Sequence, residues 1–83
     1  MYNKRTWLNP NTSPSMGSAV AFDGLNEGVH HTFLAISDCK RTIFLSKTED
    51  DTIEDFIDKM KLLRSEIDEF IKHIENEKSR EIN

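Results

Sequence analysis

Residues 48–80 contain neither glycine nor proline, and this uninterrupted segment is the feature that most constrains the fold. Its apolar side chains recur seven residues apart in three neighbouring rows, a pattern typical of an amphipathic helix with a wide apolar stripe. The rows are Ile53, Met60, Ile67 and Ile74, then Phe56, Leu63 and Phe70, then Ile57 and Ile71 with Arg64 between them. The pattern predicts one long helix over residues 48–80, with a frayed end at residues 81–83.

Two consecutive stretches resemble the start of this helix, TEDD from Thr48 and TIED from Thr52. In each, a threonine hydroxyl can accept a hydrogen bond from an otherwise unpaired backbone N–H of the first turn. The acidic residues that follow suit the positive end of the helix dipole. Either threonine is therefore a candidate for the helix cap.

The predicted helix is long for so small a chain. Even about 26 residues of this segment, if helical, extend about 39 Å, whereas a strand of five or six residues covers only about 17–20 Å. The apolar stripe therefore outruns any sheet that the rest of the chain can form, and a second copy of the helix is the usual way to cover it. We expect a homodimer or a higher even-numbered oligomer; a bent helix, or two helices folded back on the sheet, is the alternative.

Residues 1–47 read as short strands separated by turns. Strands are expected at residues 4–8, 19–23, 32–37 and 42–45, with a connection that starts at Asp23-Gly24 and runs through residue 28, and a tight polar turn over residues 38–41. A sheet of this size is weak until something packs on one of its faces. We therefore predict an α+β fold in a single domain over residues 1–83, in which an antiparallel meander of three or four strands precedes the long helix.

Charge is divided unevenly along the chain. Residues 1–47 carry five basic and three acidic side chains, a balance of +2, and residues 48–83 carry six basic and twelve acidic ones, a balance of −6. This division argues against a protein that coats DNA, which needs a broad positive face. It is compatible with a small anionic ligand near the first half or a basic protein partner along the helix.

Length, cysteine content and hydropathy suggest a soluble cytoplasmic protein. The chain has 83 residues and a single cysteine, Cys39, so it cannot form an internal disulfide. It shows no basic start followed by an apolar segment, and no apolar run long enough to span a bilayer. We expect no membrane association.

The residues most often used for metal binding or nucleophilic catalysis are poorly placed. His30 and His31 are adjacent, so on a strand they point to opposite faces, and Cys39 and His73 offer no ligand spacing that recurs in metal sites. A nucleophilic Cys39 would need a base and an orienting group, and spacing along the chain does not indicate either. We expect no metal, no cofactor and no enzymatic activity.

Arg64 is the one charged residue within the apolar rows of the helix. It can lay its stem along the stripe and reach solvent or an acidic side chain such as Glu66 or Asp68. It can also fix the register of a helix pair, or bind an anion at a subunit interface. All three interpretations remain open from the sequence.

The stretch NPNTSPSMGS contains both prolines of the chain and several hydroxyl side chains. Residues before proline are driven out of the helical region, so a structural turn is the first interpretation. A phosphate cradle is the second, because Ser13, Ser15 and Ser18 offer hydroxyls and Gly17 allows close approach to the backbone. No Walker or dinucleotide-binding motif is present in it.

The order WLNPNTSPSMGSAVAFDG, TFLAISDC, TIFL and FIDKMKLLRSEIDEFIKHI resembles small proteins of unknown function from phages and Firmicutes. More loosely, it resembles the phage anti-Thoeris sponges. Members of that family are non-enzymatic and sequester cyclic ADP-ribose-type immune signals, and some take cyclic oligonucleotides. An N-terminal antiparallel sheet is joined there to C-terminal helices that dimerise, with ligand near the subunit interfaces. The likeness covers the layout of nearly the whole chain.

This resemblance implies an anti-defence function in the cytoplasm of a bacterial host, with a nucleotide-derived ligand bound by a homo-oligomer. The residues that it points to as ligand-binding are Ser13, Ser15, Gly17, Ser18, Phe22, Arg41 and Arg64. The arginines would donate hydrogen bonds to phosphate, and Phe22 would stack on a base. The alternative is a protein-binding inhibitor or scaffold that uses the acidic helix face and takes no small-molecule ligand.

Overall fold

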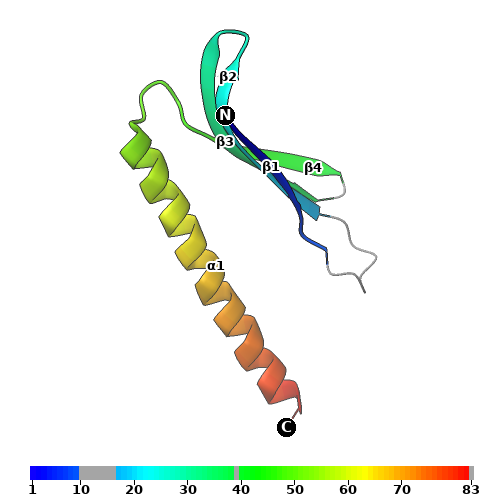
Figure 1. Cartoon of the computed structure of the whole chain (residues 1–83). Coiled ribbons are helices and arrows are strands. Elements are labelled where there is room, and N and C mark those ends of the chain that lie inside the picture. Colours follow the sequence, from blue (N-terminus) through cyan, green and yellow to red (C-terminus); the bar gives the residue numbers. More distant parts are fainter. Residues whose placement is uncertain (10–16, 39, 83) are drawn as a thin grey trace. The chain divides into compact units, whose positions relative to one another are not determined.

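A computed structural model describes residues 1–9, 17–38 and 40–82 of the chain (Figure 1). Four strands form one antiparallel sheet in the order β1-β2-β3-β4, and a single helix follows them. The elements are β1 (Tyr2–Trp7), β2 (Gly17–Asn26), β3 (Val29–Asp38), β4 (Arg41–Ser46) and α1 (Ile53–Ile82). The predicted α+β fold, a small antiparallel meander followed by one long helix, is confirmed.

Contacts divide the chain into two compact units, Met1–Glu49 with the sheet and Asp50–Asn83 with the helix. The prediction that residues 1–83 form a single domain stays a prediction, as does self-association through the helix.

The two central strands are longer than the sequence pattern indicated, because β2 and β3 meet in a two-residue turn at Glu27-Gly28. The predicted connection over residues 23–28 is too long, because residues 23–26 belong to β2, where Gly24 is buried, and only Glu27-Gly28 form the turn. Glu27 and Gly28 have φ angles of 54° and 81°, so both adopt the left-handed conformation of a type I′ hairpin turn. This turn matches the twist of the two strands.

Glu27 is the strained residue of the hairpin, because an L-residue other than Asn, Asp or Gly pays for a left-handed backbone. We expect Glu27→Asn to raise the free energy of unfolding by about 0.5–1 kcal/mol, since asparagine tolerates this conformation and favours the first position of the turn. Urea denaturation followed by circular dichroism measures the effect. Glu27→Gln removes the same charge without the conformational gain; an equal stabilisation by glutamine would assign the effect to charge.

The helix begins at Ile53, five residues later than the predicted start at residue 48, because Thr52 rather than Thr48 is its cap. The Thr52 hydroxyl oxygen accepts a hydrogen bond from Asp55 N at 3.1 Å, and Thr52 N donates to Asp55 Oδ2 at 3.0 Å. This reciprocal pair is a capping box with aspartate in place of glutamate. At the other end the helix continues through Ile82, two residues beyond the predicted boundary.

One face of the sheet carries a row of aromatic side chains. Phe22 of β2 pairs with Phe33 of β3, and Phe44 of β4 pairs with Ala35, which is two residues from Phe33 on β3. The three phenylalanines therefore share this face. The rings of Phe22 and Phe33 stack with centroids 5.2 Å apart, and Phe33 meets Phe44 edge to face at 5.6 Å. Next to this row, Ala35 is buried. The apolar core of the sheet unit is centred on β3.

The helix keeps most of its apolar stripe accessible. Phe56 is buried, and Met60 and Leu63 are half-buried. Farther along, Ile67 is 48% exposed and Phe70 62% exposed. Burial of these exposed side chains against another surface would therefore add stability.

Candidate functional site

The site that combines charge with an apolar surface lies at the turn between β3 and β4. The register places Asp38 opposite Arg41 and Ile36 opposite Ile43. Residues two apart on a strand point to the same face, so these four side chains share one face of the sheet. This face is the one opposite the phenylalanine row, because Ala35 and Phe44, which alternate with these residues, lie on the other side.

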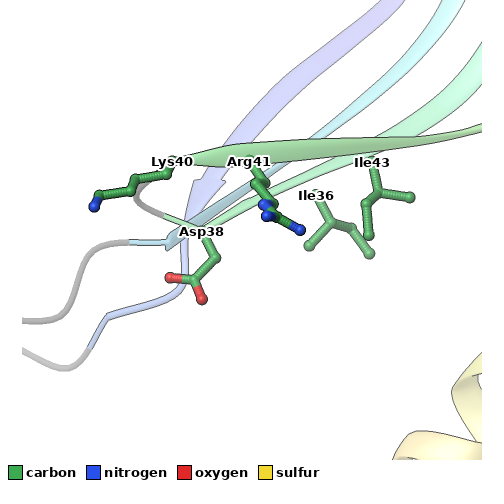
Figure 2. Close-up of a pocket in the computed structure, with 5 residues that line it drawn as sticks. All are labelled: Ile36, Asp38, Lys40, Arg41 and Ile43. Atoms are coloured by element: carbon green, nitrogen blue, oxygen red, sulfur yellow. The ribbon is translucent and has the colours of Figure 1, made fainter.

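A hollow of about 450 Å³ is lined by Ile36, Asp38, Lys40, Arg41 and Ile43. Figure 2 shows the side chains of Arg41, Ile36 and Ile43 projecting from the same side of the two strands, with Asp38 beside them, whereas Lys40 extends away from the isoleucine pair. The volume falls within the roughly 300–1,000 Å³ typical of small-molecule sites. The hollow is open on one side, as expected for a depression at the end of a sheet.

The lining provides two different kinds of recognition. Ile43 is 63% exposed, and with Ile36 it forms an apolar surface against which a flat ring can pack. Arg41 is exposed and offers a guanidinium with several N–H donors in a planar fork, which suits phosphate or carboxylate. Within the residues described, no salt bridge joins Arg41 to Asp38. The N–H donors of the Arg41 guanidinium are therefore not occupied by Asp38.

Of the predicted ligand-binding residues, the structure brings Gly17 and Arg41 to the same end and face of the sheet. Gly17 of β2 pairs with Asp38, which in turn pairs with Arg41, so the three form one row across three strands. Leu8 N donates a hydrogen bond to Gly17 O at 2.8 Å beside this row. Ser13 and Ser15 lie outside the described residues, and their predicted role stays a prediction.

The other predicted residues are not brought to this hollow. Ser18 and Phe22 lie on the opposite face of the sheet, where Ser18 is buried and Phe22 stacks on Phe33. Arg64 belongs to the helix unit and is exposed there. In the described part of the chain, no salt bridge joins Arg64 to Glu66 or Asp68. A binding role for Ser18, Phe22 and Arg64 stays a prediction.

Sequence reasoning did not find four of the lining residues: Ile36, Asp38, Lys40 and Ile43. A signal was present, because the pairing of Asp38 with Arg41 fixes the pairing of every other residue in β3 and β4. Alternation then places Ile36 and Ile43 beside Arg41.

A second polar cluster on the same face links His30, Asp23 and Thr32. Thr32 Oγ1 donates to Asp23 Oδ1 at 2.7 Å, and His30 Nε2 lies 3.1 Å from the same oxygen. His30 and Asp23 are each more than half exposed, so the cluster is a solvent-facing tie between β2 and β3.

The adjacent depression is too small for a nucleotide. It measures about 80 Å³ and is lined by His30, Thr32, Lys47, Thr48 and Glu49. His31 lies on the opposite face from His30, as strand alternation predicted. Among the described residues, no three His, Cys, Asp or Glu side chains come together as a candidate metal site.

Comparison with protein-family models, with curated proteins and with solved structures found no match to this chain. Across the described residues, the helix contains no segment apolar and long enough to cross a membrane. The class defined by the fold and the site is therefore an α+β protein with a four-stranded antiparallel meander, one long helix and an amphipathic hollow at the β3–β4 end.

Proposed function

We propose that the protein is a non-enzymatic, self-associating binding protein that sequesters a nucleotide-derived immune signal, of the cyclic ADP-ribose type or a cyclic oligonucleotide. The proposed setting is a phage protein acting in the cytoplasm of its bacterial host. The observation that carries the proposal is the hollow at the β3–β4 end, which combines Arg41 with an isoleucine surface. Sequestration requires only affinity, so binding groups suffice for this function.

The chemistry of the hollow matches the parts of a nucleotide. Arg41 would bind phosphate through charge-assisted hydrogen bonds, and Ile36 and Ile43 would pack against a base or ribose. Asp38 repels phosphate but accepts hydrogen bonds from ribose hydroxyls or an exocyclic amine, so it favours one orientation of the ligand. A second subunit would supply the wall that the open side of the hollow requires.

Isothermal titration of ligand-free protein tests the proposal. The panel contains cyclic ADP-ribose isomers and cyclic di- and trinucleotides, with inorganic phosphate and adenosine as controls for the separate parts. We expect saturable binding of at least one cyclic nucleotide and no comparable binding of either control. Flat titrations across the panel, or equal binding of phosphate alone, would contradict the proposed function.

A second candidate is a protein-binding scaffold that uses the acidic side of the helix. The observation that favours it is the exposure of Asp58, Glu66 and Glu69 along α1. Asp58→Lys combined with Glu69→Lys tests it in a pull-down from bacterial lysate, because neither residue belongs to the helix cap. Asp55 is left unchanged, since it bonds to Thr52. Specific loss of one captured basic protein, with nucleotide titrations remaining flat, would favour this candidate.

A further inference from the structure

The apolar stripe of α1 runs from Ile53 to Ile74, which is about 33 Å of helix at 1.5 Å per residue. Its two central rows alternate three and four residues apart, the spacing that lets two helices interlock their side chains. Ile53, Ile67, Phe70 and Ile74 in these rows are each between 44% and 62% exposed. A stripe of this length needs an occupant that is equally long and equally apolar.

We infer that the occupant is α1 of a second copy of this chain, running antiparallel, with Lys59 of each chain beside the partner's Glu66. This inference rests on the self-association included in the proposed function, and it adds the direction and register of the helix pair. In an antiparallel pair, each residue of one apolar row faces the other apolar row of the second helix. Several alignments of the two helices satisfy this rule. The charged side chains beside the apolar rows decide between them.

In the inferred register, Ile53 packs on the partner's Phe70, Phe56 on the partner's Ile67, and Met60 on the partner's Leu63. Two-fold symmetry repeats these contacts and produces six consecutive apolar layers. Phe56 is only 7% exposed in the single chain and Ile67 is 48% exposed, so this layer buries mainly the partner's Ile67. The layers are centred between Met60 and Leu63, near the middle of the stripe.

Charges along the edges of the stripe select this register. Lys59 and Glu66 lie on the same edge, and the antiparallel arrangement joins Lys59 to the partner's Glu66 twice. Shifting the pair by seven residues would instead place Glu66 beside the partner's Glu66 and Arg64 beside the partner's Arg64. A parallel, in-register pair would place Lys59 beside the partner's Arg64. Both alternatives bring like charges together, which opposes association.

The same register accounts for Arg64 within the stripe. Arg64 lies opposite the partner's Ile57 at the edge of the layers, so its aliphatic stem packs on an apolar side chain while the guanidinium stays in solvent. Arg64 is exposed in the single chain, consistent with a position at the edge rather than the centre. No charge is buried without a partner in this arrangement.

A charge exchange tests the pairing, because Lys59 and Glu66 are seven residues apart, about 10 Å along the helix, and cannot pair within one chain. We expect Lys59→Glu alone and Glu66→Lys alone each to raise the dimer dissociation constant at least about tenfold, since each change replaces two attractive contacts by two repulsive ones. The double variant should return to within about threefold of the original. Light scattering against concentration measures all four proteins.

Lys61→Glu is the matched control, because it makes the same charge change on an exposed position outside the stripe. It should leave the dissociation constant within about twofold. A double variant that dimerises no better than the two single variants would overturn the antiparallel register, and circular dichroism confirms that each variant retains its helix.

Cysteine cross-linking in the Cys39→Ser background independently tests whether the two helices run antiparallel. A mixture of Lys59→Cys and Glu66→Cys proteins should form a disulfide-linked heterodimer on oxidation, whereas Lys59→Cys with Arg64→Cys should not. The reverse result would establish a parallel pair and overturn the inference. A protein that stays monomeric at every concentration would overturn both the pairing and the proposed self-association, while ligand binding is decided separately by titration.

Discussion

Replacing Arg41 with glutamate is expected to weaken binding of the cyclic nucleotide about 100-fold, because the change removes charge-assisted hydrogen bonds and places a carboxylate beside phosphate. Arg41 is exposed, so the free energy of unfolding should change by no more than about 0.5 kcal/mol. Isothermal titration measures the affinity, and urea denaturation checks the fold. Arg41→Lys should retain part of the affinity, since lysine keeps the charge but loses the planar fork.

The matched control for Arg41 is Lys4→Glu. Lys4 lies on β1, on the same face of the sheet but at its opposite edge, and it does not line the hollow. The substitution makes the same change in net charge. If both variants lost affinity equally, the effect would arise from the overall charge of the protein. The proposal that the ligand binds at the β3–β4 end would then be wrong.

Phe33→Ala is expected to lower the free energy of unfolding by about 2–3 kcal/mol, somewhat less than the 3–5 kcal/mol typical of fully buried phenylalanines. Phe33 is half-buried and contacts rings on both neighbouring strands, so its removal leaves a gap in the middle of the aromatic row. In so small a unit this is a large share of the total stability. Urea denaturation monitored by circular dichroism provides the measurement.

Phe44→Ala is the comparison variant for Phe33. Phe44 is 61% exposed and has a single ring partner in the row, so its loss should cost under about 1 kcal/mol. Equal destabilisation by the two substitutions would show that the row is not centred on Phe33. A larger effect at Phe44 would indicate that its exposed ring is covered in an assembly.

The sequence predicted the order and type of the elements because the two signals involved are local. The absence of breakers over residues 48–80 and the spacing of the apolar rows indicated a helix, and short apolar runs between turns indicated strands. The boundaries depended on finer choices. Thr48 and Thr52 both carry the composition of a cap, and the helix starts directly after Thr52, which exchanges reciprocal hydrogen bonds with Asp55.

The connection between β2 and β3 was predicted to start too early for a similar reason. Asp23-Gly24 has the composition of a hairpin turn, whereas the observed turn uses Glu27, a residue that rarely adopts a left-handed backbone. Moving the turn to Glu27-Gly28 places Asp23 opposite Thr32, and the cluster with His30 follows. That cluster was out of reach of reasoning from spacing along the chain, because it depends on the register.

The candidate site was predicted only in part. Arg41 was predicted to donate hydrogen bonds to phosphate, and it does line the hollow. Gly17 lies in the same cross-strand row. Ser18 and Phe22 were grouped with them although strand alternation places both on the other face. Gly17, Ser18 and Phe22 were assigned to one binding surface because they are close in sequence, but a strand directs alternate side chains to opposite faces.

The strand order β1-β2-β3-β4 also has a consequence for how the chain folds during synthesis. Every pair of neighbouring strands is consecutive in the sequence, so each pairing closes only a short length of chain. All four strands have been synthesised before Ile53 begins the helix. The sheet can therefore form on the ribosome while the apolar helix is still emerging, which shortens the time that an unpaired strand edge and an uncovered helix stripe are exposed together.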